Sequence, residues 1–340
     1  MKNIRKRLTA IALCIMCIAS VMPITGCSLT KEKSAKDIVI CLDWTPNTNH
    51  TGLYVALEKG YYEEAGLNVT IVQPPEGGAT LMCASGQAQF AIDAQDTMAA
   101  ALDSGKPLEI TAIAAILQHN TSGILSRKGD GITNPRGLAG KTYSTWDSPI
   151  ELAIIKYCME KEDADYNSLT LIPNNITDEP SALKAKQTDA VWIFYGWSGI
   201  NASLSDVECD YFAFKDIAPE LDYYTPVLIA NNEYISEHKE ETDAFMAATI
   251  RGYEYAAKNP KEAADILIKG DDTGALQGSK DLVYASQEWI SKEYLDDNGK
   301  WGSIDANRWN TFYKWLYDNG LTTNDLTGKG FNNEWIKASN

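Results

Sequence analysis

The chain has 340 residues, 44% of them hydrophobic, and its formal net charge at pH 7 is −16. This acidity argues against a nucleic-acid partner, because neutralising a phosphate backbone requires many Lys and Arg side chains. It is otherwise typical of a well-solvated surface and identifies no ligand.

The first 26 residues predict a secretory signal peptide. Basic residues at positions 2, 5, 6 and 7 precede an apolar stretch, 8–22, that is too short for a spanning helix. Residues 24–27 (ITGC) resemble a lipobox, in which cleavage leaves Cys27 as the lipid-bearing N-terminus. The alternative is an ordinary signal peptide with an incidental cysteine. Residues 27–36 then predict a flexible tether.

Removal of this leader takes away four basic residues and brings the net charge to −20. No later segment has the eighteen or so consecutive apolar residues that a transmembrane helix requires. We therefore expect an extracytoplasmic monomer that a lipid anchors to the membrane. Cys41, Cys83, Cys158 and Cys209 are widely spaced and lack metal-ligand spacing. Free buried thiols are favoured over disulfides, although secretion would permit either state.

Alternating strand and helix patterns predict an α/β protein with mostly parallel sheets. The first series has strands at 37–43, 67–72, 88–93 and 108–117, and helices at 52–59, 79–85 and 96–103. The second has strands at 123–126, 141–144, 169–173, 189–194 and 211–214, and helices at 149–161 and 179–186. A strand-like run at 224–230 precedes helical patterns at 237–258, 261–269, 281–295 and 305–319.

About 300 residues exceed one comfortable core, so we expect two lobes. Residues 37–120 and 226–340 would form the first lobe, and residues 121–225 the second. Two strands crossing between them near 120 and 225 would make a hinge. Because ligands of open α/β sheets bind beyond the carboxyl ends of strands, the segments after each strand hold the candidate site residues.

The loop after the first strand is the richest of these segments. Asp43, Trp44, Asn47, Asn49 and His50 bring together a flat aromatic face with hydrogen-bonding groups. Such a set suits a planar polar heterocycle. The purely structural alternative is that Trp44 is a core residue, the two Asn residues form turns and His50 caps the next helix.

Polar residues also follow other predicted strands. Asp93 stands at a strand end, Asp96 is expected to be a helix N-cap, and Gln118 lies at the hinge. Ser148 and Glu151 have capping-box spacing, which is a sufficient structural explanation. The functional alternative is that Glu151, with Ser144 nearby, faces the cleft and accepts a hydrogen bond from a ligand amine.

Aromatic residues end the last strand of the second lobe and mark the return crossing. By alternation Trp192 shares a face with Phe194, whereas Tyr195 and Trp197 fall beyond the strand end. Tyr224 lies on the returning strand. Aromatic side chains from both lobes could therefore sandwich one flat ligand.

Residues 43–52 (DWTPNTNHTG), the run from Gly60 to Leu67, and the segment 192–199 resemble the ThiY-like family of solute-binding proteins for thiamine-pyrimidine precursors. The resemblance covers about residues 37–260. It implies the type II periplasmic-binding-protein fold and delivery of a formylaminopyrimidine or related compound to an ABC permease and its ATPase. It also implies a protein with no cofactor, no metal and no catalytic residue.

The same group contains pyrimidine synthases, which need a lysine for pyridoxal phosphate, a histidine consumed as substrate and a cysteine cluster for iron. In this chain Asp93 and Thr97 stand at the comparable strand end, and 220–224 has no cysteine. These departures favour a binder over an enzyme. No hydrolase or metalloprotease motif supports an enzyme either.

Other functions stay open on the sequence alone. The same fold could bind a sulfonate, taurine, nitrate or a riboflavin precursor, or could serve a membrane sensor. The candidate loops contain no Lys or Arg, which disfavours an anion.

Overall fold

The computed structural model describes residues 35–338. The predicted signal peptide, Cys27 and most of the predicted tether therefore lie outside the described residues. Within residues 35–338 no helix combines the length and apolar character needed to cross a bilayer.

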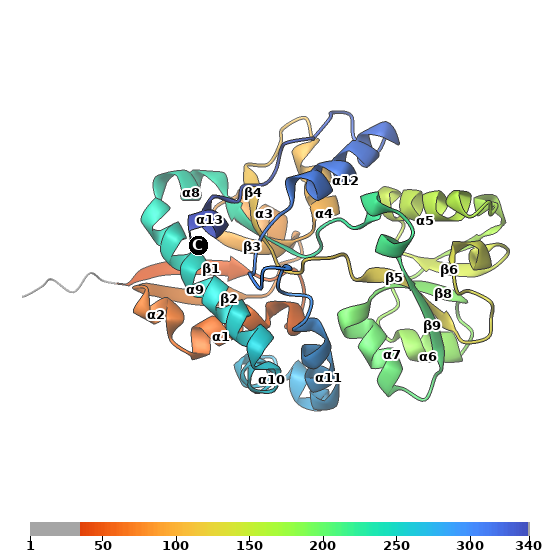
Figure 1. Cartoon of the computed structure of the whole chain (residues 1–340), viewed down its shortest axis with the longest axis horizontal. Coiled ribbons are helices and arrows are strands. Elements are labelled where there is room, and N and C mark those ends of the chain that lie inside the picture. Colours follow the sequence, from red (N-terminus) through yellow and green to blue (C-terminus); the bar gives the residue numbers. More distant parts are fainter. Residues whose placement is uncertain (1–34, 339–340) are drawn as a thin grey trace, which may run out of the picture. The chain divides into compact units, whose positions relative to one another are not determined.

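Two five-stranded sheets organise the described chain (Figure 1). The first has the order β2-β1-β3-β10-β4. Its strands are β1 (Lys36–Cys41), β2 (Leu67–Val72), β3 (Phe90–Asp93), β4 (Ile110–Ala115) and β10 (Val227–Asn231). Every residue of β3 and β10 is buried, as expected for central strands covered on both faces.

The second sheet has the order β7-β6-β8-β5-β9. Its strands are β5 (Ser122–Arg127), β6 (Thr142–Thr145), β7 (Thr170–Pro173), β8 (Ala190–Phe194) and β9 (Cys209–Ala213). β10 is antiparallel to both its neighbours in the first sheet, and β5 is antiparallel to both of its own in the second. β5 is the first strand after the chain crosses from the first sheet to the second, and β10 is the first strand after it returns. The first sheet with its helices is the first lobe, and the second sheet with its helices is the second lobe. The other four pairs are parallel, so both sheets are mixed: four strands of each run in one direction and one runs against them. The α/β class is confirmed.

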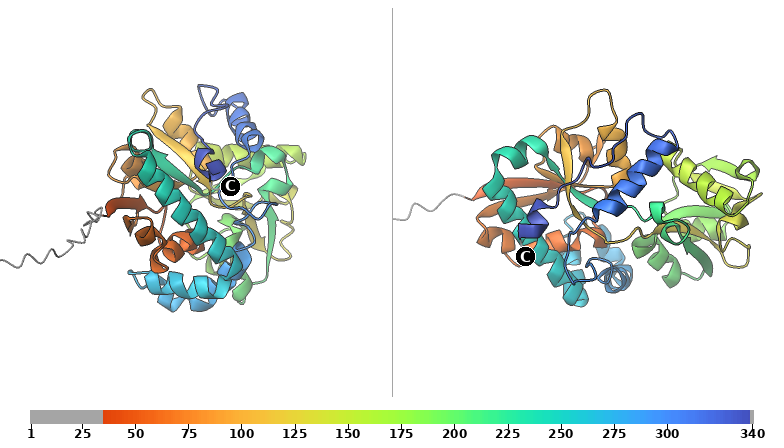
Figure 2. Two further views of the ribbon diagram at one scale, coloured as in Figure 1. Left: turned by 60° about the vertical axis from the view of Figure 1, so that its left-hand side comes forward. Right: turned by 45° about the horizontal axis from the view of Figure 1, so that its top comes forward.

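Helices cover both sheets. The first lobe carries α1 (Thr51–Glu58), α2 (Tyr61–Glu64), α3 (Gly78–Ala84), α4 (Gln95–Leu102), α8 (Asn232–Glu237), α9 (Lys239–Lys258), α10 (Pro260–Gly270) and α13 (Glu334–Ala338). The second carries α5 (Pro149–Lys161), α6 (Glu179–Lys184) and α7 (Ile200–Leu204). The last described helix, α13, belongs to the first lobe and contacts α9 (Figure 2). Short helical turns occur at η1 (Thr48–His50), η2 (Pro135–Leu138), η3 (Tyr166–Ser168), η4 (Tyr195–Gly199), η5 (Phe214–Asp216), η6 (Pro219–Leu221) and η7 (Ala275–Gly278).

Two C-terminal helices, α11 (Lys280–Ile290) and α12 (Ala306–Asp318), contact both lobes. On α12, Phe312 stacks on Tyr223 of the return crossing with ring centroids 4.1 Å apart. On α11, the Ser286 hydroxyl lies 2.6 Å from Thr48 Oγ1 of the first lobe and donates to the carbonyl oxygen of Gly196 in the second. These contacts bridge the lobes on two edges.

Two sequence-based expectations are corrected. Asp96 is not the N-cap of α4, because the helix begins at Gln95 and Ala94 occupies the cap position. The helix expected over 237–258 is α9 and begins two residues later, at Lys239, because His238 leaves helical geometry at φ −124° and ψ 52°. The four described cysteines are free, as expected; Cys41, Cys83 and Cys158 are buried and Cys209 is half-buried.

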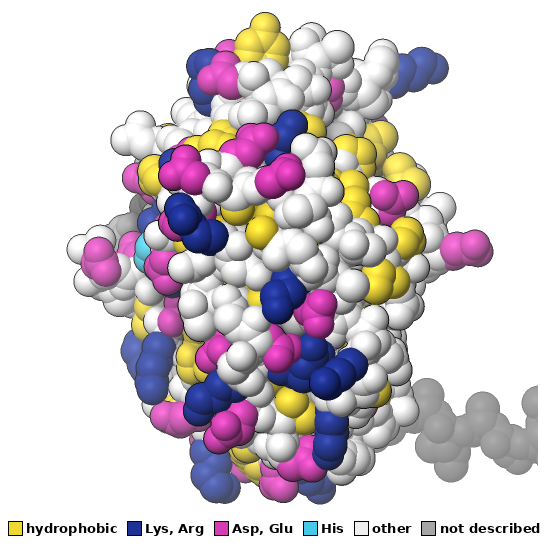
Figure 3. Space-filling model, turned by 90° about the vertical axis from the view of Figure 1, so that its right-hand side faces the viewer, with side chains coloured by type: hydrophobic (Ala, Val, Ile, Leu, Met, Phe, Trp, Pro, Cys, Tyr) yellow, Lys and Arg dark blue, Asp and Glu magenta, His cyan; other side chains and the backbone are white. Residues whose placement is uncertain are grey.

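Surface charges are mixed where they can be seen. On the face in Figure 3, acidic and basic side chains are interspersed. That face shows no broad basic patch of the kind that a nucleic-acid backbone would require.

Two glycines allow α1 and α9 to pack at backbone distance. A Cβ added at Gly52 would lie 2.2 Å from the Tyr253 ring, and one added at Gly252 would lie 2.1 Å from the carbonyl oxygen of Gly52. Tyr253 also donates from its hydroxyl to the carbonyl oxygen of Asn49, at 2.8 Å. This packing therefore holds the loop that follows β1 in place.

We predict that Gly252→Ala lowers the free energy of unfolding by about 1–3 kcal/mol, because the added methyl group overpacks a closed helix contact. Urea denaturation of the folded domain measures the change. Gly105→Ala is the matched control, since a Cβ there meets nothing within 4 Å. Equal stabilities of the two variants would contradict this account of the α1–α9 contact.

Candidate functional site

A cavity of about 220 Å³ lies between the lobes. The loop after β1 forms one wall, the end of β8 with η4 forms another, and the return crossing closes it. Its lining residues are Asp43, Trp44, Asn47, Asn49, Phe194, Trp197, Ser198, Thr225 and Pro226. A smaller cavity of about 20 Å³ shares five of these residues and also touches Leu117 and Thr121 of the outgoing crossing.

Asp43 is the one charged residue lining this cavity. Its Oδ1 lies 2.7 Å from Nε2 of His50, whose side chain is fully buried, while the Asp43 side chain is 35% exposed. The backbone N–H of Asn47 donates to Nδ1 of the same ring, at 3.2 Å. With Nδ1 accepting, Nε2 carries the proton and donates to Asp43. His50 thus orients the carboxylate and leaves its second oxygen available to a ligand.

Asn47 builds the loop as well as lining the cavity. It is the N-cap of η1, and its side-chain oxygen accepts from the backbone N–H of Asn49, at 2.9 Å. Its amide group donates to the carbonyl oxygen of Thr45, at 3.0 Å. Asn49 differs, because no group within the described chain hydrogen-bonds to its side-chain amide. The amide of Asn49 can therefore serve a ligand directly.

The second lobe contributes aromatic surface. Phe194 ends β8 and is 42% exposed, and Trp197 belongs to η4. Trp44 faces them from the first lobe and is 53% exposed. Exposed large rings around a cavity are costly unless they serve contact with something that covers them. The arrangement suits a flat molecule held between lobes, with a carboxylate at one edge.

Five of the predicted site residues meet in this cavity: Asp43, Trp44, Asn47, Asn49 and Trp197. His50 lies directly behind Asp43. The structure places the other predicted residues away from the cavity lining: Asp93, Gln118, Ser144, Ser148, Glu151, Trp192, Tyr195 and Tyr224.

Glu151 and Ser148 form the capping box of α5. The Glu151 carboxylate is buried and accepts from the hydroxyls of Tyr143, at 2.5 Å, and Thr145, at 2.8 Å, and from the backbone N–H of Ser148, at 3.3 Å. Ser144 donates to the carbonyl oxygen of Asn174. These groups are engaged within the second lobe, which favours the structural alternative for them.

Three further predicted residues, Trp192, Tyr224 and Gln118, are buried inside the protein. Trp192 is buried against Phe214, with ring centroids 4.1 Å apart. Tyr224 is buried, and its hydroxyl accepts from the backbone N–H of Asp305, at 2.8 Å. Gln118 is buried at the outgoing crossing, and its backbone carbonyl accepts from Arg308.

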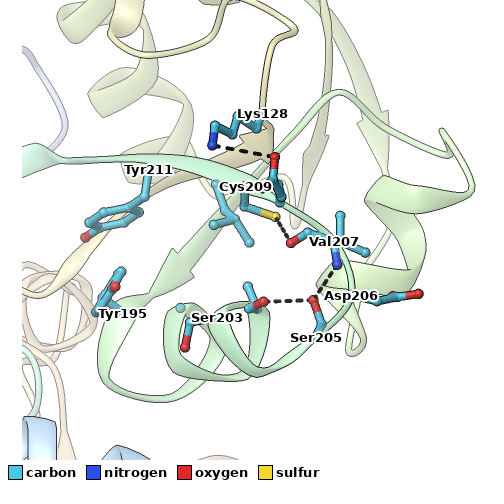
Figure 4. Close-up of a pocket in the computed structure, with 12 residues that line it drawn as sticks. Lys128, Tyr195, Ser203, Ser205, Asp206, Val207, Cys209 and Tyr211 are labelled. Carbon is cyan, nitrogen blue, oxygen red and sulfur yellow. Dashed lines mark hydrogen bonds and ion pairs between the residues drawn. The ribbon is translucent and has the colours of Figure 1, made fainter.

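Tyr195 lines a different pocket, of about 480 Å³, between α7 and β9 (Figure 4). There its ring centroid lies 4.8 Å from that of Tyr211. Tyr195 and Trp197 lie beyond the strand end, as expected, but the π-helical turn η4 directs Tyr195 into this pocket and Trp197 into the inter-lobe cavity.

Phe194, Ser198, Thr225 and Pro226 were not among the predicted site residues. Phe194 could have been found by following the face of Trp192 to the end of the strand. Thr225 and Pro226 mark the return crossing in the sequence. Ser198 carries no sequence signal, because its place depends on η4.

Asp93 sits at the end of β3 and is buried. Its carboxylate accepts from the Thr80 hydroxyl and, at 2.8 Å, from the backbone N–H of Ala94. Burial raises the pKa of Asp93 to about 7, and the charges of Asp96 and Asp43 act in the same direction. Asp93 thus supports the carboxyl edge of the first sheet without lining the cavity.

Two α/β lobes that each contain one antiparallel strand, joined by two crossings beside a pocket, define the periplasmic-binding-protein fold. Solved structures agree. The ligand-binding component of an ABC-type import system from Staphylococcus aureus is 15% identical, with a TM-score of 0.66 over 90% of this chain and 99% of the other. The aliphatic sulphonate binding protein SsuA from Escherichia coli is 12% identical, with a TM-score of 0.63 over 86% and 90%. At these identities the similarity establishes the fold alone.

The chain belongs to the NMT1/THI5-like family, whose model matches residues 47–263. A formylaminopyrimidine-binding protein from Halalkalibacterium halodurans is 26% identical over 91% of this chain and 92% of its own length. The 4-amino-5-hydroxymethyl-2-methylpyrimidine phosphate synthase THI5 from Saccharomyces cerevisiae is 25% identical over 68% and 70%. The family resemblance inferred from the sequence is therefore confirmed.

We predict that stability falls between pH 4 and pH 7 partly because of Asp93. In this window the folded protein keeps a proton on Asp93 that the unfolded chain has lost, so raising the pH favours unfolding. In Asp93→Asn the free energy of unfolding should fall by about 3 kcal/mol less over this pH range than in the wild type. Urea denaturation at pH 5 and pH 8 measures it. Glu208→Gln, which alters an exposed carboxylate, is the control; identical pH profiles of wild type and Asp93→Asn would refute the assignment.

Proposed function

We propose that the protein is the substrate-binding component of an ABC importer and binds a thiamine-related aminopyrimidine in the inter-lobe cavity. The observation that carries this proposal is the Asp43 carboxylate, oriented by His50 at the edge of a cavity lined by Trp44, Phe194 and Trp197. The family relationship to a formylaminopyrimidine-binding protein supports the choice of ligand.

The chemistry of the cavity matches that ligand class. An aminopyrimidine has two flat faces for aromatic contact and an exocyclic amine that donates hydrogen bonds. Its ring nitrogens accept hydrogen bonds, for which the free amide of Asn49 is a suitable donor. A volume of about 220 Å³ is small compared with the 300–1,000 Å³ of typical ligand pockets, which suits a single ring with short substituents.

An anionic ligand fits less well. No Lys or Arg is among the lining residues, and Asp43 would repel a sulfonate, nitrate or phosphate. A sulfonate is therefore disfavoured at this site, although a sulphonate-binding protein has the same fold.

Pyrimidine synthesis is the second candidate, because relatives in the family are synthases. A Schiff base with pyridoxal phosphate requires a lysine amine in the pocket. The residues lining the described cavity include none, and the carboxylate of Asp93 stands at the comparable strand end. The residues present do not fit that cofactor, and we derive no reaction step from it.

We predict that Asp43→Asn weakens binding of formylaminopyrimidine by about 10- to 100-fold. The Asn oxygen can still accept from His50, so the loop is preserved, but the group facing the ligand becomes a donor and the charged hydrogen bond is lost. Isothermal titration calorimetry measures the affinity. 4-Amino-5-hydroxymethyl-2-methylpyrimidine should bind better than its phosphate ester, because the cavity has no cation.

Glu151→Gln is the matched control. It disturbs a buried carboxylate in the second lobe and should lower the free energy of unfolding by about 1–3 kcal/mol, because one of the two oxygens that accept from Tyr143, Thr145 and Ser148 becomes an NH2 donor. Its affinity should match the wild type. Wild-type affinity in Asp43→Asn, or a loss in Glu151→Gln alone, would remove Asp43 from the site.

Lipid anchoring at Cys27 outside the cytoplasmic membrane is part of the proposal, since a binding component must stay near its permease. We predict that Cys27→Ser yields either an unprocessed precursor or protein released from the membrane. Detergent phase partitioning and mass spectrometry of the N-terminus provide the measurement. A processed, detergent-extractable lipoprotein in the Cys27→Ser strain would show that the anchor lies elsewhere.

A further inference from the structure

Ser198 is the hydroxyl-bearing residue that η4 contributes to the cavity wall. Its Oγ donates to Oε1 of Glu179 at 2.8 Å. A serine hydroxyl has one proton and two acceptor lone pairs. When Ser198 donates its proton in a hydrogen bond to Glu179, it can only accept a hydrogen bond from a ligand.

Glu179 is the first residue of α6, but it is not needed to cap that helix. Asp178 is the N-cap, and its side chain accepts from the backbone N–H of Ser181, at 3.2 Å. No Lys or Arg within the described chain forms a salt bridge with Glu179. Its carboxylate accepts from its own backbone N–H and from Ser198 of η4, and the contact with Ser198 is the one that needs explaining.

We propose that Glu179 is a positioning residue that fixes the Ser198 hydroxyl as a hydrogen-bond acceptor, so that the cavity selects a ligand with an N–H donor at that position. This inference rests on the proposed function. The ligand then meets two acceptors on opposite lobes, the free oxygen of Asp43 and Oγ of Ser198. The class it defines is a small heteroaromatic molecule with two separate N–H groups, one for each lobe.

The protonation state of Glu179 decides whether the Ser198 hydroxyl offers the ligand an acceptor or a donor. An ionised Glu179 can only accept, which forces Ser198 to donate to it. A protonated Glu179 can itself donate to the Ser198 oxygen. The Ser198 proton is then free to point towards the ligand N–H, and two donors that face each other repel. Affinity should therefore fall as the pH drops through the pKa of Glu179.

The surroundings of Glu179 raise its pKa above the ordinary value of a glutamate. Burial raises the pKa of Glu179, and the carboxylate of Asp178 on the same element raises it further. Hydrogen bonds from its own backbone N–H and from the neutral Ser198 hydroxyl of η4 lower the pKa in part. Asp43 is the charged group of the cavity wall on the first lobe.

Calorimetric titration with formylaminopyrimidine between pH 5 and pH 8 tests the inference. We expect Ser198→Ala to weaken binding by about 3- to 10-fold at pH 8, as for a single hydrogen bond. Glu179→Gln keeps an oxygen that can accept from Ser198, so it should bind at pH 8 about as the wild type does. Because the amide does not titrate, it should lose at least threefold less affinity than the wild type on acidification. Protonation of the ligand affects both proteins equally, so the difference between the two profiles reports Glu179.

The double variant separates positioning from stability. Adding Glu179→Gln to Ser198→Ala should cause no further loss of affinity, because Glu179 acts through the hydroxyl. Melting temperatures of the ligand-free proteins identify any folding defect. Glu208→Gln, an exposed carboxylate of the same lobe, should keep the wild-type affinity and pH profile.

A Ser198→Ala protein that binds like the wild type, or a Glu179→Gln protein with the wild-type pH profile, would overturn the inference while Asp43→Asn still tests the site. A wild-type protein that binds no aminopyrimidine would instead overturn the proposed function, and this inference with it.

Discussion

One carboxylate ties together the two stretches of chain that cross between the lobes. Asp222, on the return crossing, accepts from the backbone N–H of Asn120 at 2.9 Å and lies 2.7 Å from Nδ1 of His119, both on the outgoing crossing. Arg308, at the start of α12, places its Nε 3.5 Å from the same carboxylate. Asn120 reciprocates by donating to the carbonyl oxygen of Leu221. The cavity is built around this junction, since Thr225 and Pro226 follow it directly and Thr121 adjoins it.

The ligand-facing loop shows how structural and functional roles coincide. Asn47 and His50 form the capping box of η1, which by itself explains why these residue types occur there. The same pair sets the tautomer of His50 and so the orientation of Asp43. A structural explanation for each residue is therefore correct and does not exclude a functional one, because the cap is what holds the carboxylate in place.

The sequence patterns predicted most of the fold because both lobes follow local rules. β2 and α5 have the predicted bounds, since continuous β-branched runs and a Ser-Pro-x-Glu start are strong local signals. Of the site, the sequence predicted mainly the wall formed by the loop after β1, because this one loop carries four of the lining residues. The second wall depends on the π-helical turn η4, which has no sequence signature and which turns Tyr195 away and Ser198 inward. Glu151 and Tyr224 were ambiguous because burial, which sequence does not show, decides whether a polar group serves the fold or a ligand.

The Ser286 contact with Gly196 has an energetic consequence for movement of the lobes. Gly196 is buried, and its carbonyl oxygen accepts a hydrogen bond from the Ser286 hydroxyl on α11, beside Thr48 of the first lobe. Any separation of the lobes along this edge that did not admit water would leave that carbonyl unsatisfied, at about 1–3 kcal/mol. Hydration of a single peptide oxygen is thus coupled to the motion that would let a ligand enter or leave, and that oxygen belongs to the same turn that presents Trp197 and Ser198 to the cavity.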